Sequence, residues 1–186
     1  SRIDSGEMKI HLAEFDISNT IVNTLLTFEQ RIDAKQLEIK GLEELGPQMV
    51  YGDQDLLHQV VYNLIENAVK FTNDGGAISV QVSDSIDRTT VVIENTGPGI
   101  APEDLPMIFE RFYKTDKSRS QDKNGMGLGL YIVRTIIKLH GGEITVQSVE
   151  NEYCQFEFWL PKHEEPKLKA GKKEKDPAKD KKEEKR

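Results

Sequence analysis

Apolar residues recur every three or four positions in three stretches of the chain, which predicts three helices. Asp16 is a suitable N-cap for the first, whose apolar face carries Ile17, Ile21, Leu25, Phe28 and Ile32. The second begins at Asp53 and runs to about Phe71, with an apolar face of Leu56, Leu57, Val60, Val61, Leu64, Ile65 and Ala68. The third spans 128–140 and ends at a pair of glycines.

Alternating apolar and polar residues predict strands between these helices. Short strands are expected at 8–12, 37–41 and 48–51, the last two on either side of a Gly46-Pro47 turn. Two paired strands are expected at 77–82 and 88–94, and two closing strands at 143–149 and 153–160. Helices that alternate with mostly hairpin-connected strands imply an α/β sandwich, in which the helices pack on one face of a mixed sheet.

Charge is distributed unevenly along the 186 residues. The chain has 25 Lys+Arg, 32 Asp+Glu and a net charge of -7. Of these, 11 basic and 7 acidic residues lie in 162–186, so residues 1–161 carry about -11. An acidic body argues against a protein that coats nucleic acid, because that binding depends on Lys and Arg neutralising phosphates. Residues 162–186 contain almost nothing apolar, which predicts a disordered charged tail.

Cysteine content and hydropathy narrow the class further. A lone Cys154 excludes an intramolecular disulfide, and no cluster of Cys and His has the spacing of a zinc site. No apolar run approaches the ~20 residues that a bilayer helix requires. We therefore expect a cytoplasmic domain. Residues 1–6 have the pattern of the end of a helix closed by Gly6, which is typical of a piece of a longer protein.

Two amides and an ammonium share one face of the second predicted helix. Asn63 and Asn67 are four residues apart and Lys70 lies three further on, so the spacing places them on one side. These groups suit a hydrated Mg²⁺, which prefers oxygen ligands, together with the phosphates that it bridges. The polar edge of an ordinary amphipathic helix would have the same pattern, and this segment alone does not decide between the two.

Two glycine-rich segments have the composition of ligand-binding loops. Gly97 and Gly99 follow a predicted strand and permit close approach of a flat ligand, although a plain Gly-Pro turn has the same sequence. Three glycines between 125 and 129 open the last helix, where backbone N–H groups and the helix dipole suit an anion. That segment resembles a dinucleotide fingerprint, but the charged stretch 114–124 stands where the fingerprint needs a strand.

In this order and spacing, the segments resemble the ATP-binding domain of bacterial sensor histidine kinases. That family belongs to a superfamily shared with gyrase, heat-shock chaperone and mismatch-repair ATPases. Residues 63–71 match its asparagine box, 95–100 its first glycine box, 108–113 its phenylalanine box and 125–142 its second glycine box. The resemblance covers about 7–161, the expected catalytic domain, and implies that 1–6 ends a preceding dimerisation helix. It implies the Bergerat fold, a mixed, mostly antiparallel sheet of about five strands with about three helices on one face.

The resemblance also implies roles for individual residues. Asn67 would coordinate Mg²⁺, Asn63 would lie on the phosphate side, Lys70 would contact phosphate and Phe71 would lie against the nucleotide. Asn63 and Lys70 are thus the expected catalytic residues. Asn95 stands where the family usually has an Asp that accepts from the adenine amino group, and its carbonyl oxygen can still accept. The other expected nucleotide contacts are Gly97, Gly99, Ile100, Arg111, Tyr113, Lys114, Gly125, Gly127, Leu128, Gly129 and Leu130.

A mobile lid over the triphosphate is implied for residues 114–124, with the glycines after it as hinges. Phe109 and Phe112 are expected to anchor this lid by packing. Arg111, Lys114 and Arg119 are candidates for contact with the γ-phosphate, and each is otherwise an ordinary solvated charge.

The implied activity is transfer of the γ-phosphoryl group of Mg·ATP to a histidine. Hydrolysing branches of the superfamily hold a Glu four residues before the metal-binding Asn, and Asn63 cannot act as that general base. None of His11, His58, His140 and His163 lies in the family's acceptor context, and His140 has the position of a cationic cap on the last helix. The acceptor is therefore expected outside these residues. A degenerate nucleotide-sensing or docking domain and a gyrase-like ATPase module remain as alternatives.

Partners follow from the same resemblance. They are the protein's own dimerisation and phosphoacceptor domain and a downstream response regulator, with no nucleic acid. The parent would be a homodimer, and a bacterial inner-membrane receptor whose cytoplasmic part includes this domain.

Overall fold

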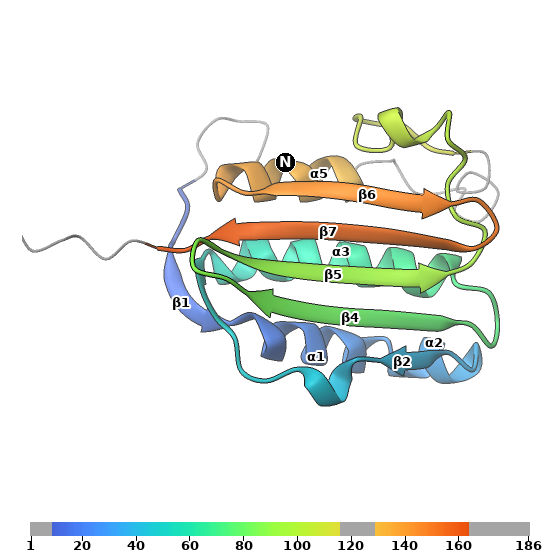
Figure 1. The fold of residues 1–186 in the computed structure, drawn as a ribbon, viewed down its shortest axis with the longest axis horizontal. Helices are drawn as coiled ribbons and strands as arrows, with labels where there is room; N and C mark the ends of the chain where they lie inside the picture. Colours follow the sequence, from blue (N-terminus) through green and yellow to red (C-terminus); the bar gives the residue numbers. More distant parts are fainter. Residues whose placement is uncertain (1–8, 116–128, 164–186) are drawn as a thin grey trace, which may run out of the picture.

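The computed structural model describes residues 9–115 and 129–163, and its helices cover one face of a five-stranded sheet (Figure 1). The strand order is β2-β4-β5-β7-β6. The strands are β2 (Glu38–Lys40), β4 (Ala77–Asp84), β5 (Arg88–Thr96), β6 (Glu143–Val149) and β7 (Tyr153–Pro161). Only β2 and β4 are parallel neighbours, and the other pairs are antiparallel. The predicted α/β sandwich with a mixed, mostly antiparallel sheet is confirmed.

Helix α3 (Gln54–Phe71) lies against the middle of this sheet, and α5 (Gly129–Leu139) lies beside it at the edge formed by β6 and β7. Asp53 is the N-cap of α3, since its side chain accepts from the Leu56 backbone N–H at 3.1 Å. The predicted apolar face of α3 is buried except for Leu56, which is half-buried, and Val69 joins it in the core. The helix therefore forms where the periodicity predicted it, between a capping aspartate and the end of its apolar stripe.

The two helices pack antiparallel to each other. The Asn63 side chain, in the C-terminal half of α3, lies near Gly129, the first residue of α5. At the other end, the backbone N–H of Asp53, just before α3, donates to Nε2 of His140, the residue that follows α5. His140 caps α5 as predicted, because its Nδ1 lies 2.8 Å from the Ile136 carbonyl oxygen. Its Nε2 accepts from the Asp53 N–H group, so the same ring also joins the end of α5 to the start of α3.

The first predicted helix is two helices, α1 (Ile17–Thr27) and α2 (Glu29–Ala34). Asp16 caps α1 as expected, accepting from Ser18 N at 3.0 Å. The break falls at Phe28, whose backbone N–H turns back to the Leu25 carbonyl oxygen and whose ring packs 5.1 Å from that of Tyr62. All five predicted apolar residues are buried, so the pattern marked the core correctly although it did not show the break.

Strand β1 (Ala13–Asp16) pairs antiparallel with β3 (Met49–Gly52) in a separate two-stranded sheet. The strand predicted at 8–12 is wrong, because residues 9–12 are in no strand. Their alternation does not correspond to burial, and the partner β3 reaches only as far as Ala13. The strands predicted at 37–41 and 48–51 exist as β2 and β3 but do not pair with each other, since β2 joins the main sheet. A 3₁₀-helix, η1 (Leu42–Glu44), lies between them.

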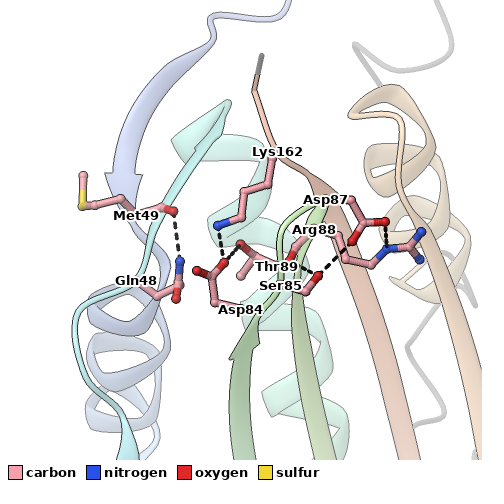
Figure 2. A network of polar contacts seen from close by, with 8 residues as sticks. All are labelled: Gln48, Met49, Asp84, Ser85, Asp87, Arg88, Thr89 and Lys162. Carbon is pink, nitrogen blue, oxygen red and sulfur yellow. Dashed lines mark hydrogen bonds and ion pairs between the residues drawn. The ribbon is translucent and has the colours of Figure 1, made fainter. Parts of the chain in front are cut away.

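Two described residues follow β7, and the first of them, Lys162, lies against the end of the sheet furthest from Thr96 (Figure 2). The Lys162 ammonium pairs with the Asp84 carboxylate, and the backbone N–H of Lys162 donates to the Asp87 carbonyl oxygen at 2.9 Å. The His163 ring stacks on that of Tyr51, with centroids 3.9 Å apart. These are the first two residues of the predicted tail.

The remaining predictions about the ends of the chain concern residues outside the described part. These are the end of the dimerisation helix at 1–6 and the tail from residue 164 onward. Within residues 9–115 and 129–163, no helix is long and apolar enough to cross a membrane.

Candidate nucleotide-binding site

The C-terminal half of α3 supplies the first part of the candidate site. Asn63 and Asn67 are half-buried there, and Lys70 and Phe71 occupy the last turn, with the Lys70 ammonium 5.5 Å from the centroid of the Phe71 ring. The Asn63 amide donates through Nδ2 to the Gly129 carbonyl oxygen at 3.5 Å. This long contact links the asparagine face of α3 to the start of α5.

Asn95 supplies a hydrogen-bonding group at the end of β5. Its side chain is buried, with 7% of its surface exposed, and Nδ2 donates to the Thr96 carbonyl oxygen at 3.0 Å. With the nitrogen committed to this contact, Oδ1 is the oriented acceptor of the amide. Asn95 thus offers the same kind of hydrogen-bonding group as an aspartate, without its charge.

Gly97 brings the loop after β5 against the end of α3. Its φ of 149° is one that L side chains rarely adopt, and a Cβ here would lie 2.6 Å from the Phe71 carbonyl oxygen. Its N–H donates to the Glu152 carbonyl oxygen at 3.2 Å. The glycine is therefore required both by its backbone conformation and by the close approach of the two chain segments.

The β6–β7 turn holds the other side of this loop. Ile100 donates its N–H to Ser148 Oγ at 2.8 Å, and that hydroxyl donates in turn to the Tyr153 carbonyl oxygen at 2.7 Å. Gly99 has a φ of 63°, and a Cβ would lie 2.5 Å from the Val149 carbonyl oxygen. Sequence reasoning missed Ser148, because a serine in a strand carries no local signal that it will anchor a loop 48 residues away.

The segment 101–115 packs beside this loop without regular helices apart from a 3₁₀ turn, η2 (Leu105–Met107). Phe109 packs edge-on against Phe156 of β7, with ring centroids 6.1 Å apart, as the prediction of an anchor requires. The Tyr113 hydroxyl donates to the Asp104 carboxylate, which joins two positions of this segment nine residues apart.

Phe112 is not an anchor, and that prediction is wrong. It is 59% exposed and has a φ of 64°, which directs its ring away from the core; Ile108, with 5% exposed, is the buried residue of this turn. Arg111 is also exposed, and its guanidinium lies 5.4 Å from the ring centroid of Tyr131 on α5, whereas Lys114 is half-buried.

The second glycine motif is described only from its last two positions. Gly129 and Leu130 form the first turn of α5 and are half-buried. Gly125, Gly127, Leu128 and Arg119, together with lid residues 116–124, lie outside the described residues, so their predicted roles stay predictions.

Cys154 lies directly across from Asn95 in the β5–β7 pairing. Burial raises the pKa of its thiol to about 12, with the nearby Glu94 charge acting in the same direction and a hydrogen bond with Ser148 opposing both. The thiol is therefore neutral at physiological pH and adds no charge beside the Asn95 amide.

These groups match the requirements of a Mg·nucleotide. Mg²⁺ usually keeps several waters and substrate phosphates as ligands and takes few from the protein, so neutral amide oxygens such as those of Asn63 and Asn67 suit it. The absence of a side chain at Gly97 lets the loop after β5 approach the end of α3 closely, so that the loop can present backbone to a flat ring. The contacts Asn63–Gly129 and Phe71–Gly97 bring three of the four predicted boxes together around one end of α3.

The model of the Histidine kinase-, DNA gyrase B-, and HSP90-like ATPase family matches residues 52–164, well over half of the chain. The chain belongs to this family. That range contains α3, the loop after β5, the segment around Phe109 and α5.

Similar proteins are sensor histidine kinases. The sensor protein SrrB of Staphylococcus aureus is 43% identical over 84% of this chain and 32% of its own length. Hybrid signal transduction histidine kinase D of Dictyostelium discoideum is 33% identical over 87% of this chain and 11% of its own length. The chain thus spans a third or less of these relatives.

One solved structure resembles the fold of this chain along almost the whole length of the solved domain. The catalytic domain of histidine kinase ThkA is 30% identical with a TM-score of 0.69, and the match covers 82% of this chain and 98% of that domain. ThkA has also been solved in complex with the response regulator TrrA; that match is 28% identical, with a TM-score of 0.68, and covers 86% of this chain and 44% of ThkA.

Proposed function

We propose that this chain is the Mg·ATP-binding catalytic domain of a sensor histidine kinase, which transfers the γ-phosphoryl group of ATP to a histidine on a dimerisation domain outside these residues. The observation that carries the proposal is the junction between Phe71 and Gly97. It joins the asparagine face of α3 to the loop that holds the oriented Asn95 acceptor. Membership of the ATPase family and similarity to histidine kinase catalytic domains support it.

The adenine ring would lie against the loop after β5. Asn95 Oδ1 would accept from the exocyclic amino group, because the Nδ2 of the same amide is held by Thr96. Gly97, Gly99 and Ile100 would border the ring with backbone, and the Phe71 side chain would contact the nucleotide.

The phosphates would lie toward the asparagine face of α3 and the start of α5. Lys70 would contact phosphate, and Asn67 would hold Mg²⁺, with Asn63 beside it. When bound, Mg²⁺ neutralises phosphate charge in such transfers. Gly125, Gly127, Leu128, Gly129 and Leu130 would supply backbone N–H groups at the N-terminus of α5, where the helix dipole favours an anion. Arg111, Tyr113 and Lys114 would border the phosphates from the segment before the lid.

Transfer requires a neutral imidazole nitrogen in line with the γ-phosphorus. The nitrogen forms a bond to phosphorus as the bond to the β–γ bridging oxygen breaks, and ADP leaves with that oxygen. Water is a poor competitor in this site, because Asn63 stands where a general base would be needed and an amide cannot accept the proton. The domain would therefore contribute positioning and charge, and no covalent chemistry of its own.

The partners of the parent protein belong to the same proposal. The acceptor domain would form a homodimer, and a response regulator would receive the phosphoryl group; the structure of ThkA in complex with the response regulator TrrA supports such a partner. The parent would be a membrane receptor, with this domain on the cytoplasmic side.

Phosphotransfer in trans tests the proposal. The chain is mixed with the acceptor-helix dimer of its parent and γ-³²P-ATP, and phosphate on the partner is followed by gel. We expect label that is lost in acid and retained in base, as a phosphoramidate on imidazole requires. A matched acceptor with its histidine changed to Ala must remain unlabelled. Nucleotide binding without any label on the intact acceptor would contradict the kinase assignment, and rapid ATP hydrolysis by the chain alone would favour a gyrase-like ATPase.

A further inference from the structure

Lys35 reaches the C-terminal end of α3, where Lys70 and Phe71 are found. Its ammonium Nζ lies 2.7 Å from the Val69 carbonyl oxygen and 3.2 Å from that of Lys70. Lys35 itself is the residue that follows α2, so the contact joins two parts of the chain 34 residues apart. Its side chain is half-buried beneath the turn that follows α3.

The last carbonyl groups of a helix have no N–H partners further along the helix. In α3, the Ala68 carbonyl oxygen accepts from both the backbone N–H and the hydroxyl of Thr72. The next two carbonyls, of Val69 and Lys70, accept from Lys35. The residue that caps α2 therefore completes the end of α3 at the two positions that directly precede Phe71.

Lys35 also fixes the turn that leaves α3. Its carbonyl oxygen accepts from the Gly75 backbone N–H at 2.8 Å. The Phe71 carbonyl oxygen, next in line after those that Lys35 holds, faces the backbone of Gly97. Lys35 thus holds the carbonyls of residues 69 and 70, whereas Gly97 meets the carbonyl of Phe71.

The charge of Lys35 acts at the same place as its hydrogen bonds. The C-terminus of a helix carries partial negative charge, which is unfavourable beside an anionic polyphosphate, and a cation there offsets it. Desolvation by burial is the largest influence on the Lys35 ammonium and lowers its pKa; Asp74 acts to raise it and Arg31 to lower it further. A partly desolvated cation is screened less by water than an exposed one.

We propose that Lys35 is a positioning residue for the nucleotide site, which holds the end of α3 so that Lys70 faces the phosphates and places a positive charge behind it. This inference rests on the proposed function. The Lys35 ammonium donates to backbone carbonyls of α3, so it acts on the nucleotide through the residues that it holds.

Calorimetric titration with Mg·ATP, and NMR titration with adenosine, test this role. Lys35→Met removes the charge and the donors but keeps most of the stem, Lys35→Arg keeps both, and Lys40→Met is the control on β2, where the lysine side chain is 55% exposed. We expect Lys35→Met to lose about 10-fold in ATP affinity, the loss of charge-assisted hydrogen bonds, and adenosine affinity to change less than about 2-fold. Lys35→Arg should recover most of the ATP affinity, and Lys40→Met should bind like the wild type.

Three results would overturn the inference. One is wild-type ATP affinity in folded Lys35→Met. Another is an equal loss for ATP and adenosine that Lys35→Arg does not rescue, because that is the signature of a merely structural role. If Lys35→Met does not fold, as judged by circular dichroism, Lys35→Gln takes its place, since it keeps one donor without the charge; wild-type ATP affinity in that variant is the third result.

The same measurements separate this inference from the proposed function. A wild-type chain that binds neither ATP nor adenosine contradicts nucleotide binding itself, and the Lys35 inference falls with it. A wild-type chain that binds ATP together with a Lys35→Met chain that binds it equally well contradicts only the role of Lys35.

Discussion

The His140 imidazole accepts a hydrogen bond from the Asp53 backbone N–H at 3.0 Å, while its other ring nitrogen lies 2.8 Å from the Ile136 carbonyl oxygen. A carbonyl can only accept and a backbone N–H can only donate, so these partners fix the ring as the neutral tautomer with its proton on Nδ1. One side chain therefore closes the end of α5 and joins it to the start of α3, the helix that carries the candidate metal and phosphate residues.

Removing the His140 ring should destabilise the fold. His140→Ala leaves the Asp53 N–H and the Ile136 carbonyl without their partner, and we expect a loss of about 1–3 kcal/mol in the free energy of unfolding in urea. His58→Ala is the matched control, because that ring is exposed on α3, and it should change stability by less than about 0.5 kcal/mol. Equal stability of the two variants would show that the Asp53–His140 contact contributes nothing.

The Asp53 carboxylate should contribute stability that depends on pH. Burial acts to raise its pKa, but hydrogen bonds from the backbone N–H groups of His11, Leu56 and Asp55 outweigh this, so the net pKa lies below its ordinary value. A pKa that is lower in the folded state gives stability that is present above the unfolded value of about 3.9 and is lost as pH falls through the folded value.

Asp53→Asn tests this dependence. We expect it to be less stable than the wild type at pH 7 by less than about 1 kcal/mol, because Asn still accepts as an N-cap and only the charge is lost, and the difference to narrow below about pH 4. Urea unfolding between pH 7 and about pH 2.5 measures it, with Asp55→Asn at an exposed position as the control. A difference that stays constant across this range would mean that the charge of Asp53 is not involved.

The Cys154 thiol should resist alkylation in the folded protein. With its pKa raised to about 12, its thiolate fraction at pH 8 is about 10³-fold below that of an ordinary cysteine. We expect iodoacetamide to modify it slowly in buffer and rapidly in urea, as followed by mass spectrometry. The chain has a single cysteine, so the signal is unambiguous. Equally fast modification in both conditions would contradict a buried thiol next to Asn95.

Asn67→Ala should remove the Mg²⁺ dependence of ATP binding. The wild type is expected to bind Mg·ATP with a dissociation constant between micromolar and millimolar, about -4 to -8 kcal/mol, and more weakly in EDTA. In the variant, calorimetry should give the same affinity with and without Mg²⁺. Asn19→Ala, at an exposed position on α1, should retain the dependence. An Asn67→Ala chain that still requires Mg²⁺ would exclude this residue as the metal ligand.

Features that depend on neighbouring residues could be predicted from the sequence. Asp53 and the apolar stripe of α3 are coded within 18 residues, and helix and cap appear where they were expected. The position of β1 depends instead on pairing with β3, from Asp16 to Met49, and no local alternation reports such a partner.

Long-range contacts also set the parts of the site that the sequence did not show. Lys35 meets Val69 and Ser148 meets Ile100 only because the fold brings them together, 34 and 48 residues apart. Phe112 appeared to be an anchor because it belongs to an aromatic segment, but the left-handed backbone at this residue turns it to solvent. The order of the boxes could be predicted from the sequence, whereas the residues that hold them in place could not.

Gly97→Ala should disturb both the fold and the candidate adenine loop. A methyl group there would lie 2.6 Å from the Phe71 carbonyl oxygen, a backbone atom at the end of α3, and the residue has a φ of 149°. We expect a loss of about 2 kcal/mol or more in unfolding free energy, because strain and a backbone clash add. Gly46→Ala is the matched control: nothing lies within 4 Å of the position of an added Cβ, and stability should stay the same or rise by up to about 1 kcal/mol.

The same substitution tests the adenine loop. In a Gly97→Ala chain that remains folded, ATP affinity should fall together with adenosine affinity, because the loop would move away from Asn95. This is the opposite of the selective loss expected at Lys35. Unchanged adenosine affinity in a folded Gly97→Ala chain would place the nucleobase elsewhere.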